Sequence, residues 1–250
     1  MSKKLEGQVA VVTGASKGIG AAIAEHLAAA GAAVVVNYAS SRAGAEAVVQ
    51  RIRQSGGKAV AVQADVSKLE DVRRLFAETR KAFGKLDILV NNAGVYEFAP
   101  LEAISAEHFH KQFDLNVLGL LLTTQEAVKQ FGPAGGSIIN ISSGAATSAP
   151  PNISVYSGTK AAVNAITRSL AQELGPRKVR VNGIAPGMIE TEGLHATGIS
   201  GSDFQRQVET QTPLGRIGQP QDIAPAVVFL ASAESAYTTG ETLYISGGLR

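Results

Sequence analysis

A tyrosine and a lysine, Tyr156 and Lys160, stand four residues apart in the chain. On a helix this separation places both side chains on one face, about one turn apart. A free phenol has a pKa near 10, which is too high for efficient proton exchange at neutral pH. An ammonium about 4 Å away, at an effective dielectric constant near 20, stabilises the phenolate by roughly 4 kcal/mol, which lowers the phenol pKa by about three units. Burial of the phenolate raises the pKa, so about three units is the largest expected lowering. The pair is therefore expected to act as an acid and base near neutral pH, although the spacing alone also fits an ordinary surface pair.

A second candidate for chemistry is a glycine-rich turn between an apolar run at 9–12 and an alanine-rich segment at 21–30. A buried strand, a glycine turn and a helix are typical of the first unit of a dinucleotide-binding fold, where the helix N-terminus faces the pyrophosphate. The spacing is Gly-x-x-x-Gly-x-Gly rather than Gly-x-Gly-x-x-Gly, so a plain tight turn is the alternative. The turn reads Thr13-Gly14-Ala15-Ser16-Lys17-Gly18-Ile19-Gly20.

Strands that alternate with helices must position these residues. Unalternating β-branched runs, such as 33–37, are typical of parallel strands that are covered on both faces. Strands are predicted at 9–12, 33–37, 59–62, 86–90, 137–141, 179–184 and 242–245. Helices are predicted at 21–30, 41–54, 69–83, 106–131, 154–174 and 221–230. This order predicts one α/β domain over 1–250, a Rossmann-type doubly wound fold with a seven-stranded parallel sheet and helices on both faces. Residues 189–212 are rich in Gly, Ser and Thr and are expected to form a mobile substrate flap.

Composition narrows the function. The 250 residues include 23 basic and 21 acidic side chains, which are interspersed and leave a net charge of +2. This balance gives no support to a nucleic-acid or membrane partner. There is no cysteine, which excludes disulfides and thiolate catalysis. His108 and His110 are two apart and point different ways on a helix, so no metal site is expected. Without a signal peptide or an 18-residue apolar stretch, the sequence predicts a soluble, cytoplasmic protein.

Taken together, the motifs resemble those of the short-chain dehydrogenase/reductase family over essentially the whole chain. Each motif is weak alone, but all of them occur in the family's order and at the expected strand ends or helix positions. The matching positions are Thr13 to Gly20, Asn91-Asn92-Ala93-Gly94, Asn116, Ser142-Ser143, Tyr156 with Lys160, and Pro186-Gly187 with Thr191.

The resemblance implies a catalytic tetrad of Asn116, Ser143, Tyr156 and Lys160. Tyr156 would give a proton to a carbonyl oxygen or take one from an alcohol, and Lys160 would lower its pKa and hold the nicotinamide ribose. Ser143 would hydrogen-bond the same oxygen. Ser142 is a rival that the residues alone do not exclude, but the family's spacing to the tyrosine selects Ser143. Asn116 would lie in a kinked helix whose free carbonyl binds a proton-relaying water; an ordinary core asparagine is the alternative.

The resemblance also implies a nicotinamide cofactor, and the end of the second strand indicates which one. Relatives that prefer NAD carry an acidic residue there, which takes the ribose 2′-hydroxyl and repels a 2′-phosphate. Here the strand ends without an acid, and Lys17 and Arg42 make the pocket cationic, which favours NADP(H); a solvated Lys17 is the alternative. The expected cofactor-binding residues are Gly14, Ser16, Lys17, Gly18, Ile19, Gly20, Asn37, Tyr38, Ser40, Arg42, Asp65, Val66, Asn91, Ala93, Gly94, Tyr156, Lys160, Pro186, Gly187, Ile189 and Thr191.

The residues expected to face the substrate are mostly small or apolar, as suits a small ketone, aldehyde or secondary alcohol. They are Val95, Tyr96, Gly144, Ala145, Ala146, Met188 and parts of 192–208. A 3-oxoacyl-thioester reductase is the runner-up. Relatives that act on carrier proteins tend to place basic residues just before the fifth strand, whereas 132–136 has none, although Arg177 remains available.

Two alternatives belong to other classes of protein. A non-catalytic, nucleotide-sensing binder would use the same scaffold, but the complete tetrad argues against it. A methyltransferase would favour an acid at the end of the second strand. The family is commonly tetrameric, so a homotetramer is expected. Ser246 stands where relatives often carry Asp, which leaves the details of a C-terminal interface open.

Overall fold

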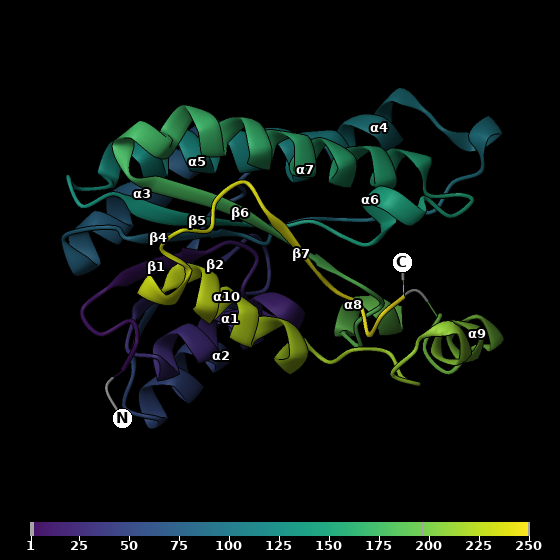
Figure 1. Ribbon diagram of the computed structural model, residues 1–250, viewed down its shortest axis with the longest axis horizontal. Coiled ribbons are helices and arrows are strands. Elements are labelled where there is room, and N and C mark those ends of the chain that lie inside the picture. The colour runs from purple at the N-terminus through teal and green to yellow at the C-terminus, as the bar shows by residue number, and fades with distance from the viewer. Residues whose placement is uncertain (1–2, 197, 250) are drawn as a thin grey trace.

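The computed structural model describes residues 3–196 and 198–249. Within them, the strands form one parallel sheet in the order β3-β2-β1-β4-β5-β6-β7, which confirms the predicted doubly wound fold (Figure 1). The strands are β1 (Val9–Val12), β2 (Ala33–Tyr38), β3 (Lys58–Gln63), β4 (Ile88–Asn91), β5 (Gly136–Ile141), β6 (Val179–Pro186) and β7 (Thr242–Ile245). The order reverses between β1 and β4, and ligands of open α/β sheets bind at the carboxyl ends of the strands at such a point.

Helices cover both faces of the sheet (Figure 1). One layer contains α1 (Gly18–Ala29), α2 (Arg42–Gln54) and α10 (Pro220–Ala231). The opposite layer contains α3 (Leu69–Phe83), α4 (Ala106–Phe113), α5 (Gly119–Gln130) and α7 (Ser154–Leu174). Because alternate strand residues point to opposite faces, both faces need apolar residues and the strands read as continuous apolar runs.

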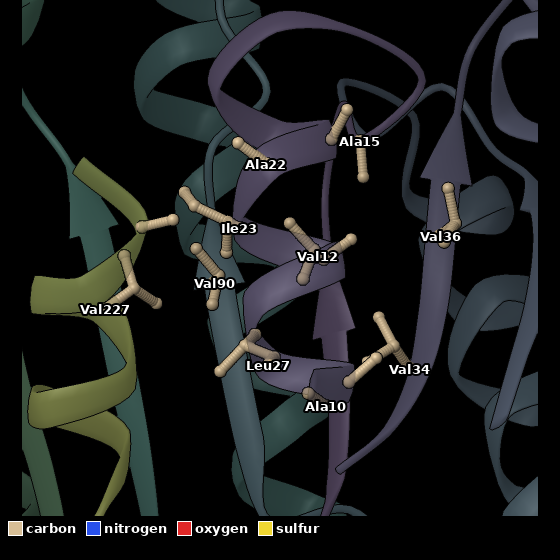
Figure 2. Packing of buried hydrophobic residues seen from close by; sticks show 14 of the residues in the cluster. Ala10, Val12, Ala15, Ala22, Ile23, Leu27, Val34, Val36, Val90 and Val227 are labelled. Carbon is tan, nitrogen blue, oxygen red and sulfur yellow. The ribbon is translucent and has the colours of Figure 1, made fainter. Parts of the chain in front are cut away.

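The core on the α1 side shows this alternation directly. Figure 2 shows Ile23 and Leu27 of α1 lying over Val12 of β1 and Val90 of β4. Val11 points the other way, into the second cluster beneath α3, α5 and α7. This packing fixes the turn between β1 and α1 at the carboxyl edge of the sheet.

The structure differs from the predicted elements in three places that border the site. One is the short α6 (Ala145–Ser148), which was not predicted and begins two residues after Ser143. The predicted helix at 106–131 is interrupted by a π-helical turn at Asp114–Leu118 between α4 and α5. Residues 189–212 contain α8 (Glu192–Ala196) and α9 (Asp203–Gln211), which the weak periodicity did not predict. Local caps help to form both helices, because Thr191 Oγ1 accepts a hydrogen bond from the Leu194 amide and Ser202 Oγ accepts one from the Gln205 amide.

No helix in the described part of the chain combines the length and the apolar character that crossing a membrane requires.

Candidate active site

Three polar side chains meet where β5 ends and α7 passes over it. Tyr156 and Lys160 lie one turn apart on α7, with the Lys160 Nζ 5.8 Å from the centre of the Tyr156 ring. Ser143 follows β5 and hydrogen-bonds the Tyr156 phenol. The neighbouring Ser142 is buried and donates to the Lys160 carbonyl at 3.2 Å. Ser143, rather than Ser142, therefore stands beside the phenol.

The pKa values in this cluster differ from the expectation that Lys160 lowers the pKa of Tyr156. Burial raises the pKa of the Tyr156 phenol, the Ser143 hydrogen bond opposes this rise, and the nearby Tyr96 adds to it. Burial also lowers the pKa of Lys160, to about 8. The Lys160 ammonium donates to the Ile141 carbonyl at 2.8 Å. The expected lowering of the Tyr156 pKa by Lys160 is not seen, because desolvation is the largest influence on the pKa of Tyr156 and the one that shifts the pKa of Lys160.

The π-helical turn places Asn116 between two segments of the site. Its Nδ2 donates to the Val95 carbonyl at 2.8 Å and its Oδ1 accepts from the Val95 amide at 2.9 Å. Nδ2 also lies 3.1 Å from Thr159 Oγ1 on α7. The side chain thus ties the segment after β4 to α7. Thr159, which sequence reasoning missed, is the partner on α7.

A small internal cavity of about 10 Å³ lies between this turn and Lys160. Its polar walls include Asn91, Thr123 and Lys160. A cavity needs roughly 10–15 Å³ and two to four polar partners to hold one water molecule. The space is therefore the size of a single water in contact with the lysine.

The glycine turn is pinned to the end of β4. Gly14 has φ +61°, and a Cβ on it would lie 2.9 Å from the Ala93 Cα. Thr13 Oγ1 accepts hydrogen bonds from the amides of Asn92 and Ala93 at 2.9 and 3.0 Å. Asn92 Nδ2 donates back to the Thr13 and Gly14 carbonyls. The motif that contains Asn91 and Gly94 thus fixes the shape of the turn.

The start of α1 fits the phosphates of a dinucleotide. Gly18 has φ +55°, and the first turn of α1 has neither a side-chain cap nor an acidic residue. Its unpaired amides and the helix dipole favour an anion. We call the glycine turn and the first turn of α1, residues 14–20, the phosphate cradle. Thr191 and Glu192 lie next to it, because a Cβ on Gly18 would lie 3.3 Å from the Thr191 methyl group and 3.6 Å from Glu192 Oε2. Gly20, Ile19 and Ser16 belong to the same turn.

Asn37, near the end of β2, lies beside the glycine turn and bonds to the backbone around it. Its side chain is 1% exposed, accepts from the Gly14 amide at 3.1 Å and donates to the carbonyls of Val62 and Ala64. These bonds hold the turn against β2 and β3. The asparagine therefore positions the cradle, and its amide is already satisfied by backbone groups.

Arg42 opens α2 on the rim of the same cradle. It pairs with Glu46 at 2.7 Å, and both side chains are mostly exposed. The helix packs directly on the turn, because a Cβ on Gly44 would lie 2.7 Å from the Ser16 carbonyl oxygen. Tyr38 and Ser40 lead into this helix at the end of β2. The start of α2 thus packs against Ser16 of the glycine turn.

The remaining predicted cofactor residues are spread along the carboxyl edge of the sheet. The Asp65 carboxylate accepts from the Ser67 amide and hydroxyl, and Val66 is buried against Gly119 of α5. Pro186 ends β6, and the Gly187 amide bonds to the Ile245 carbonyl. Ile189 is buried, next to the segment that carries Thr191.

Asn91 belongs to a buried polar network that sequence reasoning missed. Its amide bonds to Asn140 at 2.9 Å, to Thr124 at 3.1 Å and to Thr123 at 2.7 Å. Asn140 in turn donates to Thr167 of α7 at 2.9 Å. Asparagine inside the apolar β5 run was the available signal, because a buried amide needs partners. The network ties β4, β5, α5 and α7 together beneath the site.

Comparisons with known proteins identify the family of the chain. The sequence model of the family described as "Enoyl-(Acyl carrier protein) reductase" matches residues 14–250. An uncharacterized oxidoreductase of Methylorubrum extorquens is 60% identical, with 99% of each chain covered. A hydroxynaphthalene reductase-like protein of Metarhizium majus is 39% identical, covering 98% of this chain and 96% of the relative. A solved short-chain dehydrogenase/reductase from Serratia marcescens is 36% identical with a TM-score of 0.93, covering 98% of this chain and 99% of that one. The chain belongs to the short-chain dehydrogenase/reductase family, whose members are oxidoreductases that use nicotinamide cofactors.

Proposed function

We propose that this protein is an NADP(H)-dependent reductase of small ketones and aldehydes, running in reverse on secondary alcohols. The observation that carries the proposal is the meeting of Ser143, Tyr156 and Lys160 at the same sheet edge as the glycine turn. A substrate carbonyl oxygen can be held there by two hydroxyl groups, beside a cradle that fits a dinucleotide.

Each residue has a distinct role in this reaction. The bound dinucleotide supplies the hydride. Tyr156 donates its proton to the carbonyl oxygen, and burial keeps the phenol protonated at neutral pH, ready to act as the acid. The Ser143 hydroxyl donates a hydrogen bond to the same oxygen and stabilises its developing charge. The Tyr156 phenolate left by this transfer would regain a proton from Lys160, and Lys160 would be resupplied from solvent through the adjacent cavity, whose volume suits one water.

The choice of NADP(H) is supported by Lys17 and Arg42 on the rim of the cradle and by the lack of an acid at the end of β2. We expect Lys17→Ala to weaken NADPH binding about fivefold, because an exposed charge pair with phosphate contributes up to about 1 kcal/mol, and to leave NADH binding unchanged. Fluorescence titration of both nucleotides measures this. Lys81→Ala, which removes another exposed lysine near the end of α3, is the control. Equal weakening of both nucleotides would refute the role of Lys17.

Glu192 is expected to oppose nucleotide binding. Its carboxylate stands near the first residue of α1, where it occupies the favourable end of the helix dipole and repels phosphate. Glu192→Gln should tighten NADPH binding about threefold to tenfold at low salt, with a smaller gain at high salt because ions screen the repulsion. Glu209→Gln in α9 is the matched control. Unchanged or weaker binding in Glu192→Gln would contradict this account.

A 3-oxoacyl-thioester reductase is the second candidate, supported by the carrier-protein substrate in the description of the matching family. Two observations favour the small carbonyl instead. Residues 132–136 carry no basic side chain, and the Arg177 guanidinium donates to the Val128 carbonyl at 2.7 Å within the fold. A non-catalytic nucleotide binder has no need for the Ser143, Tyr156 and Lys160 cluster.

The test is NADPH oxidation, followed by absorbance, with a panel of ketones and aldehydes and one 3-oxoacyl thioester, and with NADH in parallel. Faster turnover of small carbonyls with NADPH supports the proposal. A preference for the thioester selects the second candidate. Tight nucleotide binding with no carbonyl turnover would overturn the enzymatic function.

We also propose a homotetramer. Apolar side chains that are partly exposed on α4 and in the π-helical turn, Phe109 and Leu118, support assembly because burial against another copy removes them from water. Light scattering of the purified protein measures the mass. The cytoplasmic location stays a prediction.

A further inference from the structure

A row of aromatic rings leads away from the catalytic phenol. The Tyr96 ring lies 5.8 Å from the Tyr156 ring, with the two planes inclined at 58°. Tyr96 directly follows Val95, whose amide and carbonyl are both held by Asn116. The backbone that precedes Tyr96 is thus held by the same asparagine that ties the segment to α7.

Phe98 continues the row outward. Its ring meets Tyr96 edge to face at 6.1 Å and 85°, and the side chain is 51% exposed. The segment is held in place because the Ala99 amide donates to the Asn152 carbonyl in the loop before α7, at 2.8 Å. The rings therefore run from the interior of the site to the molecular surface.

Tyr96 also reaches the flap. A Cβ on Gly193 of α8 would lie 3.9 Å from the Tyr96 hydroxyl oxygen and 3.6 Å from Thr191 Oγ1. The ring thus stands between the catalytic tyrosine on one side and α8 on the other. The Tyr96 ring is therefore the aromatic group next to the phenol that would hold a substrate carbonyl oxygen.

We propose that Tyr96 is the specificity-determining residue of the site and that the row Tyr96–Phe98 selects carbonyl compounds conjugated to a planar aromatic ring over saturated ones of equal size. This inference rests on the proposed carbonyl reductase function. Offset or edge-to-face contacts between aromatic rings contribute up to about tenfold in binding beyond the burial of area, which a saturated ring does not gain. Because Phe98 packs against Tyr96, the ring is already oriented before substrate arrives.

The test compares acetophenone with cyclohexyl methyl ketone, which share one carbon skeleton and differ in ring saturation. We expect Tyr96→Leu to lower the ratio of their kcat/KM values about tenfold, through a higher KM for acetophenone, and to change turnover of the saturated ketone less than threefold. Tyr96→Phe should keep the wild-type ratio because it retains the ring. Tyr237→Leu, at a fully exposed tyrosine, is the control for a change of the same kind elsewhere.

The outcomes separate the inference from the function on which it rests. An unchanged ratio in Tyr96→Leu, with both ketones still reduced, overturns the role of Tyr96 alone. A ratio that falls equally in Tyr96→Phe assigns the selection to the hydroxyl and overturns ring stacking. If the wild-type protein reduces neither ketone nor any other carbonyl, the reductase function fails and the inference fails with it.

Discussion

Replacing Tyr156 with phenylalanine is expected to lower kcat for carbonyl reduction about 1,000-fold, within the range of roughly 10² to 10⁴ that a positioned acid contributes. The phenol hydroxyl is the group beside Ser143 that carries a proton into the site. Phenylalanine keeps the ring and its packing against Tyr96. Folding should therefore stay close to that of the wild type, and NADPH binding should weaken far less than kcat, because one of many nucleotide contacts is lost.

Steady-state kinetics with NADPH and a reactive ketone measure the loss, and nucleotide titration measures binding in the same preparation. Tyr237→Phe removes the hydroxyl of an exposed tyrosine and should leave kcat unchanged. A Tyr156→Phe protein that keeps full activity would show that another group protonates the substrate.

Lys160→Met is expected to lower kcat about 100-fold and yet to stabilise the nucleotide-free protein at pH 7. The lysine is buried, and burial lowers its pKa from 10.5 to about 8. A pKa difference of one between the folded and unfolded states corresponds to about 1.36 kcal/mol, so the buried charge lowers stability by roughly 3 kcal/mol. The Ile141 carbonyl loses its partner in the variant, which costs about 1–3 kcal/mol. The net expected gain is about 1 kcal/mol.

The pH dependence of this difference has a definite sign. Below pH 8 the lysine is charged in the folded and unfolded states, and the full penalty of burial is present. Between pH 8 and 10.5 the folded protein loses this proton while the unfolded chain keeps it, so wild-type stability rises by about 1.36 kcal/mol per pH unit relative to the variant. Urea denaturation at pH 7 and pH 10 measures both proteins, with Lys129→Met as the exposed control. If the free energy of unfolding of Lys160→Met exceeds that of the wild type by the same amount at pH 7 and pH 10, then the buried lysine does not lose its proton between these pH values, which contradicts this account.

The strands and the two chemical motifs could be predicted because they depend on short-range patterns. The apolar runs of β1 and β2 indicate burial on both faces without further information. The four-residue spacing of Tyr156 and Lys160 places them on one face of α7, as observed. Their order along the chain then places both motifs at the same edge of a parallel sheet.

The electrostatics could not be predicted in the same way. The pKa of Tyr156 depends on how much water reaches it, and spacing along a helix carries no information on burial. In the sequence, Asn37 was informative only because it is not an acidic residue. In the structure, its side-chain amide hydrogen-bonds to the backbone of β3 and of the glycine turn, which are both distant from it in sequence. Such bonds become visible only when the sheet is assembled.

The irregular and short helices near the site could not be predicted from the sequence either. The only sequence signal for the π-helical turn is Asn116, a poor helix former among apolar residues, and it does not indicate an irregular helix by itself. Helix α8 is five residues long, which is too short to show a helical period in the sequence, and Thr191 caps its start. The π-helical turn holds the backbone of Val95, next to Tyr96, and α8 brings Gly193 near the Tyr96 hydroxyl.

The central claim is that this site transfers a hydride from NADPH to a carbonyl carbon. The most direct measurement uses NADPH that carries deuterium at the transferable position of nicotinamide C4, together with acetophenone, and analyses the product by mass spectrometry. The account predicts an alcohol with one deuterium on the carbinol carbon, formed by the wild type and about 1,000-fold more slowly by Tyr156→Phe. An alcohol without deuterium, or nucleotide binding with no alcohol formed, would contradict it.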